Sequence, residues 1–122
     1  MAPIRVLVCD DVEAFRALMR YTLQEDPGIE VVGEAADGMA AIAAAERLQP
    51  DVVLLDLTMP VLDGIDAIPA VLECAPGARV VALSGWGAER MAERALANGA
   101  IAYLEKTDDV HAIRAAVRAA AA

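Results

Sequence analysis

The fold of this chain is decided by residues 51–60, which read DVVLLDLTMP. Val52–Leu55 form a continuous apolar run, without the alternation of a strand that has one face in water. Such runs are typical of strands buried on both faces, which occur in parallel sheets covered by helices. Asp56 follows the run directly. A carboxylate there indicates a functional site, because open parallel sheets bind ligands outside the carboxyl ends of their strands.

Four further apolar runs lie before and after this stretch. Together they predict five strands, at Ile4–Cys9, Ile29–Glu34, Val52–Leu57, Arg79–Ser84 and Ala102–Glu105. The segments between them are amphipathic, and the first carries apolar residues at helical spacing, at Phe15, Leu18, Met19 and Leu23. This alternation predicts an α/β fold with a parallel sheet and right-handed helical crossovers.

Local signals predict where several helices begin and end. Asn98-Gly99 has the composition of a helix C-cap, and Thr107 or Asp108 is suited to N-cap the last helix. Pro69 is tolerated best in a first helical turn, because proline lacks the N–H that later turns require. The third helix is therefore expected to start late, near Asp66, or to bend.

The composition favours one acidic domain that spans residues 1–122. Ten basic and nineteen acidic residues give a net charge of −9, which opposes direct binding to nucleic acid. No apolar run reaches the roughly 18 residues of a membrane span, and no signal peptide is recognisable. We therefore expect a soluble, cytoplasmic protein without membrane contact. Cys9 and Cys74 lack CxxC spacing and are expected to be structural.

The polar residues at the predicted strand ends describe one site, made of Asp10, Asp11, Asp56, Ser84 and Lys106. Three converging carboxylates would repel one another unless a cation neutralised them. Mg²⁺, which takes few carboxylates and several waters, suits such a site and also neutralises an incoming phosphoryl group. Lys106 can pair with Asp56 and then with a phosphoryl oxygen, and Ser84 can donate a hydrogen bond. Asp56 can act as the nucleophile that forms an acyl phosphate.

The order of these residues resembles the receiver domain of two-component response regulators, over essentially the whole chain. The matching segments are Cys9–Asp11, Leu54–Pro60, Asp63-Gly64, Ala82–Gly85, Gly99-Ala100 and Tyr103–Lys106. Residues 31–35 and 51–56 are most similar to the branch whose members carry a C-terminal helix-turn-helix. The resemblance implies a flavodoxin-like (βα)5 three-layer sandwich, with a five-stranded parallel sheet in the order 2-1-3-4-5.

The resemblance also implies a role for each site residue. Asp56 would accept the phosphoryl group from a sensor histidine kinase. Mg²⁺ would be bound by Asp11 and Asp56 directly, by Asp10 through water, and by the backbone carbonyl of Thr58. Ser84 and Tyr103 match the switch pair of the family, and Lys106 matches its lysine. Thr107 stands where many receivers have proline, which leaves open whether the 106–107 peptide is cis.

Two further residues invite functional interpretation. Trp86, two residues after Ser84, is large for a position that overlooks the phosphorylation site. It is either a packing aromatic of the loop or a screen over Asp56 that sets the lifetime of the phosphate. His111, the only histidine, is expected to be a solvated helix residue.

Three other functions fit the residues of this site less well. A phosphatase of the haloacid dehalogenase type also forms an aspartyl phosphate, but it requires a second Asp where this chain has Thr58. A flavin-binding protein would need a Ser/Thr/Gly-rich phosphate loop after the first strand, where Asp10 and Asp11 would repel the anion. A receiver-like interaction module that works without phosphorylation would not need all five site residues.

The sequence therefore predicts a phosphorylation-dependent signalling switch. It is not expected to be an enzyme with a separate substrate, although it would catalyse its own phosphorylation and dephosphorylation. Phosphorylation would move Ser84 and the loop 84–88, opening space for Tyr103. The surface of the fourth helix, fifth strand and fifth helix would then change. This change would favour or oppose binding of a downstream protein, docking of an output domain of the same protein or formation of a homodimer.

Overall fold

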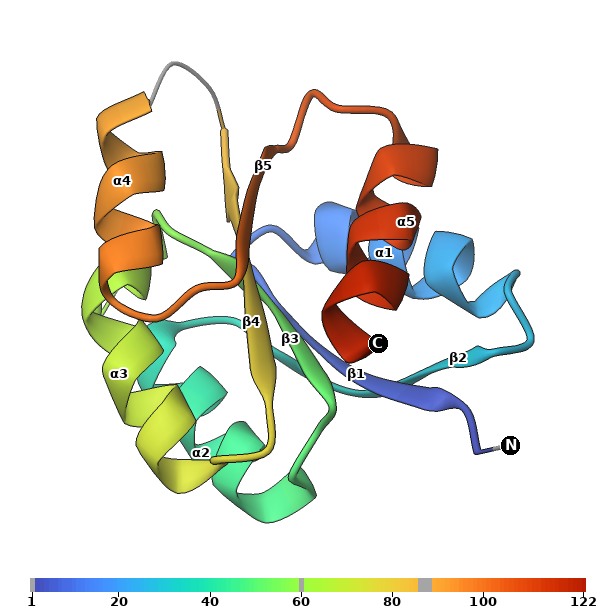
Figure 1. Cartoon of the computed structure of the whole chain (residues 1–122), viewed down its shortest axis with the longest axis horizontal. Coiled ribbons are helices and arrows are strands. Elements are labelled where there is room, and N and C mark those ends of the chain that lie inside the picture. The colour runs from blue at the N-terminus through green and yellow to red at the C-terminus, as the bar shows by residue number, and fades with distance from the viewer. Residues whose placement is uncertain (1, 60, 86–88) are drawn as a thin grey trace.

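The computed structural model describes residues 2–59, 61–85 and 89–122 (Figure 1). Five strands alternate with five helices along this part of the chain. In chain order they are β1 (Ile4–Cys9), α1 (Glu13–Gln24), β2 (Ile29–Ala35), α2 (Gly38–Leu48), β3 (Val52–Asp56), α3 (Gly64–Cys74), β4 (Arg79–Ser84), α4 (Glu89–Ala97), β5 (Ala102–Glu105) and α5 (Val110–Ala121). The five predicted strands are all present, within one residue of their predicted ends.

The sheet is parallel, with the strand order β2-β1-β3-β4-β5. Helices α1 and α5 lie on one side of it, and α2, α3 and α4 lie on the other (Figure 1). Every residue of β3 is buried, as the continuous apolar run predicts for a strand covered on both faces. The predicted flavodoxin-like three-layer fold and its strand order are confirmed.

The two faces of the sheet are packed with side chains of different size. On the side of α2, α3 and α4, many core positions are alanine, among them Ala41, Ala44 and Ala45 of α2. On the side of α1 and α5, larger side chains such as Met19, Leu23 and Ile113 fill the core. Fully burying a side chain of that size stabilises the fold by roughly 1.5–3 kcal/mol.

The end of α4 follows the prediction made from Asn98-Gly99. Gly99 has a φ of +116°, in the left-handed region that glycine tolerates best. The N–H of Ala100 donates to the carbonyl of Ala95 at 3.0 Å, and the N–H of Gly99 donates to that of Leu96 at 3.2 Å. These two bonds are those of a Schellman C-cap.

The predicted N-cap of the last helix was wrong. Asp109, and neither Thr107 nor Asp108, caps α5 by accepting a hydrogen bond from the N–H of His111 at 3.0 Å. The carboxylate of Asp108 accepts instead from the N–H of Glu105 at 3.0 Å, which closes the turn after β5. Three adjacent residues can all cap a helix, and the geometry of that turn selects the last of them. The peptide bond between residues 106 and 107 is not cis.

The predicted late start of the third helix was also wrong. Helix α3 begins at Gly64, where the side chain of Asp63 accepts from the N–H of Ile65 at 2.8 Å. Pro69 lies inside the helix and is exposed. The exposed ring does not have to pack in the core.

Gly64 is required because α3 begins against the end of β3. A Cβ atom at residue 64 would lie 2.5 Å from the Cα of Leu57, and it would also meet the carbonyl oxygen of Asp56. We expect Gly64→Ala to lower the free energy of unfolding by about 2 kcal/mol, because the backbone after β3 has to move. Alanine normally stabilises a helix relative to glycine, so the expected sign is the reverse of the helix propensity.

Urea denaturation measures this change in stability. Gly77→Ala is the matched control, because a Cβ there meets nothing within 4 Å. It is expected to change stability by less than about 0.5 kcal/mol. A Gly64→Ala protein as stable as the wild type would show that the approach of α3 to β3 is not as tight as described.

Candidate functional site

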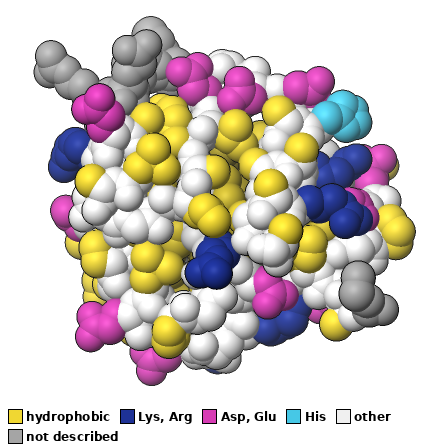
Figure 2. Space-filling view, in the orientation of Figure 1, with side chains coloured by type: hydrophobic (Ala, Val, Ile, Leu, Met, Phe, Trp, Pro, Cys, Tyr) yellow, Lys and Arg dark blue, Asp and Glu magenta, His cyan; other side chains and the backbone are white. Residues whose placement is uncertain are grey.

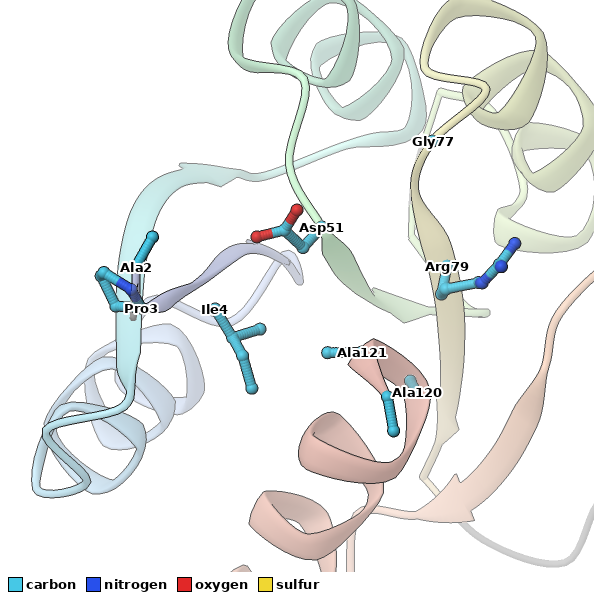
Figure 3. Close-up of a pocket in the computed structure, with 9 residues that line it drawn as sticks. Ala2, Pro3, Ile4, Asp51, Gly77, Arg79, Ala120 and Ala121 are labelled. Carbon is cyan, nitrogen blue, oxygen red and sulfur yellow. The ribbon is translucent and has the colours of Figure 1, made fainter.

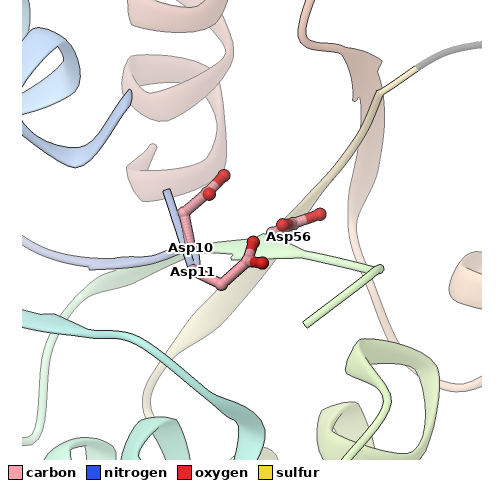
Figure 4. A group of neighbouring side chains, drawn as sticks. All are labelled: Asp10, Asp11 and Asp56. Atoms are coloured by element: carbon pink, nitrogen blue, oxygen red, sulfur yellow. The ribbon is translucent and has the colours of Figure 1, made fainter. Parts of the chain in front are cut away.

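Three carboxylates meet at the carboxyl ends of β1 and β3 (Figure 4). Strands β1 and β3 are neighbours, with Cys9 paired to Leu55, so the residues that follow them lie side by side. Asp10, Asp11 and Asp56 each offer one carboxylate oxygen, and these atoms lie within 4.8 Å of one another. Asp10 and Asp56 are buried, whereas Asp11 is exposed.

Lys106 reaches the same cluster from β5. Its backbone N–H donates to the carbonyl of Ser84 at 2.8 Å, which continues the pairing of β4 and β5 by one residue. Its Nζ lies 2.5 Å from Oδ2 of Asp10 and donates to Oδ2 of Asp56 at 3.2 Å. The ammonium group therefore pairs with both buried carboxylates at once.

The electrostatics of the cluster are set by burial and by this pairing. Burial is the main reason why the pKa of Asp10 is raised; the close contact with Lys106 and the hydrogen bond from Val12 oppose this, and the charge of Asp56 adds to it. Burial alone would lower the pKa of Lys106, but its close contact with Asp10 and the charges of Asp56 and Asp10 outweigh that, so the pKa is raised. Lys106 therefore remains charged and compensates the buried carboxylates.

Both oxygens of the Asp56 carboxylate are engaged. The N–H and the Oγ1 hydroxyl of Thr58 each donate to Oδ1 at 3.0 Å, while Lys106 donates to Oδ2. The hydrogen bonds from the Thr58 N–H and hydroxyl were not predicted from the sequence, from which only the backbone carbonyl of Thr58 is expected to take part. A hydroxyl two residues after a strand-end Asp was the signal for this contact, because such side chains often close local turns.

The contact between Phe15 and Lys106 was also not predicted from the sequence. Lys106 Nζ lies 4.8 Å from the centroid of the Phe15 ring, within the range of a cation–π interaction. Phe15 was assigned to the apolar face of the first helix, and it does pack partly buried against the core. One side chain thus contributes both to that core and to the position of the ammonium group.

The two residues expected to form the switch lie on neighbouring strands. Ser84 is buried at the end of β4, and Tyr103 of β5 pairs with Ala82, two residues before Ser84. Since side chains alternate along a strand, Ser84 and Tyr103 project to the same face of the sheet. The Tyr103 hydroxyl is buried and has no hydrogen-bond partner among the described residues.

The remaining predicted residues have simple outcomes. Trp86 lies outside the described residues. His111 is exposed in the first turn of α5, as expected of a solvated helix residue. Cys9 and Cys74 are both free, and burial raises the pKa of both thiols, which suits structural cysteines.

A separate cavity of about 330 Å³ lies at the amino ends of the strands, opposite the acidic cluster (Figure 3). It includes Asp51 and Arg79, at the amino ends of β3 and β4. Asp51 is already engaged, because its carboxylate accepts from the N–H of Arg5 at 2.9 Å and its carbonyl accepts from the N–H of Arg79 at 2.9 Å. These bonds tie strand ends together, so we assign no chemistry to this cavity.

The donor set of the acidic cluster fits a hard divalent cation. Its ligand atoms are carboxylate oxygens, which Mg²⁺ prefers. Oδ2 of Asp10 is buried and has no hydrogen bond of good geometry among the described residues, although it pairs with Lys106. One exposed and two buried carboxylates leave part of the site open to water, which Mg²⁺ usually retains.

Residues 6–118 of the chain match the response regulator receiver domain family. The chain belongs to this family. The predicted family is therefore confirmed, and with it the predicted class of function, a phosphorylation-dependent signalling switch.

Known relatives agree with this assignment. The chain is 43% identical over 107 residues to protein-glutamate methylesterase/protein-glutamine glutaminase 5 of Myxococcus xanthus, covering 87% of the chain and 31% of that protein. It is 37% identical over 117 residues to the transcriptional regulatory protein LiaR of Bacillus subtilis, covering 96% of the chain and 56% of LiaR. The signal receiver domain of the putative response regulator NarL from Mycobacterium tuberculosis superposes with a TM-score of 0.93 at 35% identity, over 99% of this chain and 98% of that one.

The methylesterase and LiaR are longer than this chain. The chain spans about a third of the length of the methylesterases it matches, and about half that of LiaR. Similarity to LiaR and NarL agrees with the predicted similarity to the helix-turn-helix branch. The receiver domain is what all of them have in common with this chain.

Lys106 is expected to stabilise the fold as well as to serve the site. We expect Lys106→Met to lower the free energy of unfolding by about 2 kcal/mol at neutral pH without divalent cations, because two buried carboxylates lose their compensating charge. The loss should shrink as the pH falls toward the raised pKa of Asp10, because a protonated Asp10 needs no partner. In the wild type, the contribution of Lys106 is complete below its unfolded pKa of 10.5 and is lost only as pH rises through the higher folded value.

Chemical denaturation at several pH values measures both effects. The double variant Lys106→Met/Asp10→Asn tests the cause, since removal of one buried carboxylate should recover part of the loss. Equal losses at neutral pH and at the lowest pH at which the protein stays folded, with no recovery in the double variant, would show that packing of the lysine and not its charge is responsible.

Proposed function

We propose that residues 1–122 act as one receiver domain in which Asp56 accepts a phosphoryl group. The observation that carries this proposal is the setting of Asp56. Its carboxylate is buried at the end of the central strand, held by Thr58 and Lys106, and faces Asp10 and Asp11. A carboxylate with this orientation and with cationic compensation nearby is suited to act as a nucleophile.

Mg²⁺ is the cofactor that we propose for this site. Asp11 and Asp56 would hold it directly, Asp10 would hold it through water, and the backbone carbonyl of Thr58 would complete the protein ligands. The ion would neutralise the carboxylates and the phosphoryl oxygens. The acidic cluster supports this assignment, since ligand oxygens within 4.8 Å of one another can share one ion.

The chain's own residues account for the rest of the transfer. An oxygen of Asp56 forms a bond to phosphorus while the bond from phosphorus to the imidazole nitrogen of the kinase histidine breaks, and the electron pair leaves with the imidazole. Lys106 then has a phosphoryl oxygen as an additional charged partner, and the Ser84 hydroxyl can donate to another. The histidine kinase is thus the phosphoryl donor.

The structural change caused by phosphorylation would be transmitted through β4 and β5. A shift of Ser84 toward the phosphoryl group changes the space on the face of the sheet that Tyr103 shares with it. Beyond Tyr103 lies the surface formed by α4, β5 and α5, on which hydrophobic side chains gather (Figure 2). Leu96 of α4 and Ile101, which precedes β5, are half exposed. We propose that this surface binds the downstream protein, an output domain of the same protein or a second copy of this one.

The partners and the setting follow from the same proposal. A net charge of −9 argues that the domain itself does not bind nucleic acid. No helix among the described residues has the length and apolarity needed to cross a membrane. We propose a cytoplasmic domain that catalyses its own phosphorylation and dephosphorylation and has no separate substrate. The methylesterase activity named for some relatives belongs to proteins about three times as long.

Phosphorylation of Asp56 can be tested with a small phosphoryl donor. Incubation of the wild type with acetyl phosphate and Mg²⁺ should add the mass of one phosphoryl group, and Asp56→Asn should abolish the addition. Asp63→Asn is the matched control, because Asp63 lies in the same loop but caps α3 through its side chain, which asparagine also does. Intact-protein mass spectrometry measures the product.

Two results would contradict the proposal. Wild-type labelling of Asp56→Asn would mean that another residue is phosphorylated. A wild-type protein that accepts no phosphoryl group from acetyl phosphate, phosphoramidate or a histidine kinase would favour the alternative of an interaction module that works without phosphorylation.

Trp86 is proposed to set the lifetime of the phosphate, on the ground of its size and its place two residues after Ser84. Trp86→Ala should change the rate of dephosphorylation and leave Mg²⁺ affinity nearly unchanged. A tenfold change in rate corresponds to only about 1.4 kcal/mol in the barrier, so modest shielding is measurable. Equal phosphate half-lives in the two proteins would make Trp86 a packing residue of the loop.

A further inference from the structure

We propose that Arg16 of α1 is a positioning residue that sets the Mg²⁺ affinity of the site without touching the ion. This inference rests on the proposed Mg²⁺ site. It names a residue outside the acidic cluster and assigns it the task of orienting the peptide that joins Asp10 to Asp11.

The guanidinium group of Arg16 donates a hydrogen bond to the backbone of the acidic loop, residues 10–12, which joins β1 to α1. Nη1 donates to the carbonyl oxygen of Asp10 at 2.7 Å, and Nε donates to Oε1 of Glu34 at 3.1 Å. The side chain is only 16% exposed. A planar guanidinium held by two acceptors has little freedom to turn, so it fixes the direction of the Asp10 carbonyl.

The direction of this carbonyl matters because little else orients Asp11. The N–H of Asp10 donates to the carbonyl of Ala35 at 2.9 Å, and the N–H of Val12 donates to Oδ1 of Asp10 at 2.8 Å. These bonds hold the two ends of the loop. Among the described residues no hydrogen bond holds the exposed Asp11 carboxylate itself. Its placement therefore depends on the orientation of the 10–11 peptide.

Glu34 anchors the arginine from β2. It pairs with Val8 of β1, so its backbone is fixed by the sheet. Arg20, one turn after Arg16 on α1, also forms an ion pair with Glu34, through Oε2. Arg20 has no recorded contact with Asp10 among the described residues. Both arginines are positively charged and both pair with Glu34, but among the described residues only Arg16 donates a hydrogen bond to the Asp10 carbonyl.

Loss of the Arg16 charge and loss of its positioning contact are expected to change Mg²⁺ affinity in opposite directions. Removing a positive charge close to the site would strengthen cation binding if electrostatic repulsion governed the effect. Loosening the 10–11 peptide would weaken it, because Asp11 would have to be ordered when the ion binds. Arg16→Lys keeps the charge but has a single nitrogen for two acceptors, and Arg16→Gln removes the charge as well.

Calorimetric titration with MgCl2 separates these effects. We expect Arg16→Lys and Arg16→Gln to bind Mg²⁺ about tenfold more weakly than the wild type, in the range seen when residues that orient metal ligands are lost. Arg20→Lys and Arg20→Gln should differ from the wild type by less than about twofold, since they leave the orientation of the metal ligands intact. Asp11→Ala gives the scale for the loss of a ligand.

A measurement without metal tests the positioning directly. In metal-free ¹H–¹⁵N spectra, the amide signals of Asp11 and Val12 should shift or broaden in Arg16→Lys and remain in place in Arg20→Lys. Thermal unfolding in EDTA should show that both variants are fully folded at the temperature of the titrations, although Arg16→Lys loses contacts to Glu34 and Asp10 and Arg20→Lys loses only one to Glu34. A reduced affinity in Arg16→Lys alone is then not a consequence of general destabilisation.

Three outcomes would overturn the inference. They are Mg²⁺ affinity in Arg16→Lys equal to that of the wild type, tighter binding in Arg16→Gln, and equal weakening in the Arg20 variants. A wild-type protein that binds no Mg²⁺ would contradict the proposed function instead. Unchanged Asp11 and Val12 amide signals in metal-free Arg16→Lys would also overturn the inference about Arg16, and they would leave the proposed Mg²⁺ site uncontradicted.

Discussion

The site depends on the compensation of two buried carboxylates by one ammonium group. Asp10 and Asp56 lie at the ends of neighbouring strands with almost no exposure to water, and Lys106 is within ion-pair distance of both. Buried charges are tolerated only when they are paired and hydrogen-bonded. The pairing with Lys106 therefore lets the ends of β1 and β3 keep two carboxylates inside the fold. This is the arrangement that the proposed cation and phosphoryl group would enter.

The register of the strands places these charged groups next to one another. The pairing of Cys9 with Leu55 brings the residues after β1 and β3 together, and the bond from the Lys106 N–H to the Ser84 carbonyl extends the pairing of β4 and β5 to the lysine. Contacts from outside the strands then refine the site. Thr58 holds one oxygen of Asp56, and Phe15 lies against the ammonium group. Backbone pairing thus sets the positions of the charges, and side chains set their orientation.

The sequence predicted the alternation of strands and helices and the members of the cluster, because both depend on patterns that are local in the chain. The strand order was implied by the resemblance to receiver domains. A continuous apolar run followed by Asp56 is visible in residues 51–60, and Asn98-Gly99 ends α4 as its composition predicts. The two errors have different origins. Asp109 caps α5 although Asp108 was equally suited, because neighbouring residues compete for the cap. Helix α3 starts at Gly64 with Asp63 as its cap, although the exposed Pro69 lies inside it.

The sequence by itself determined the order of strands and helices, the buried central strand and the chemical types at the strand ends, since each follows from hydrophobic periodicity or from a short motif. Only the tertiary structure decided which long-range partners these groups have. Lys106 bridges Asp10 and Asp56 across the sheet, and Arg16 joins the Asp10 carbonyl to Glu34. Residues 10, 34 and 106 are far apart along the chain, and their distances depend on register and on packing that no single segment encodes.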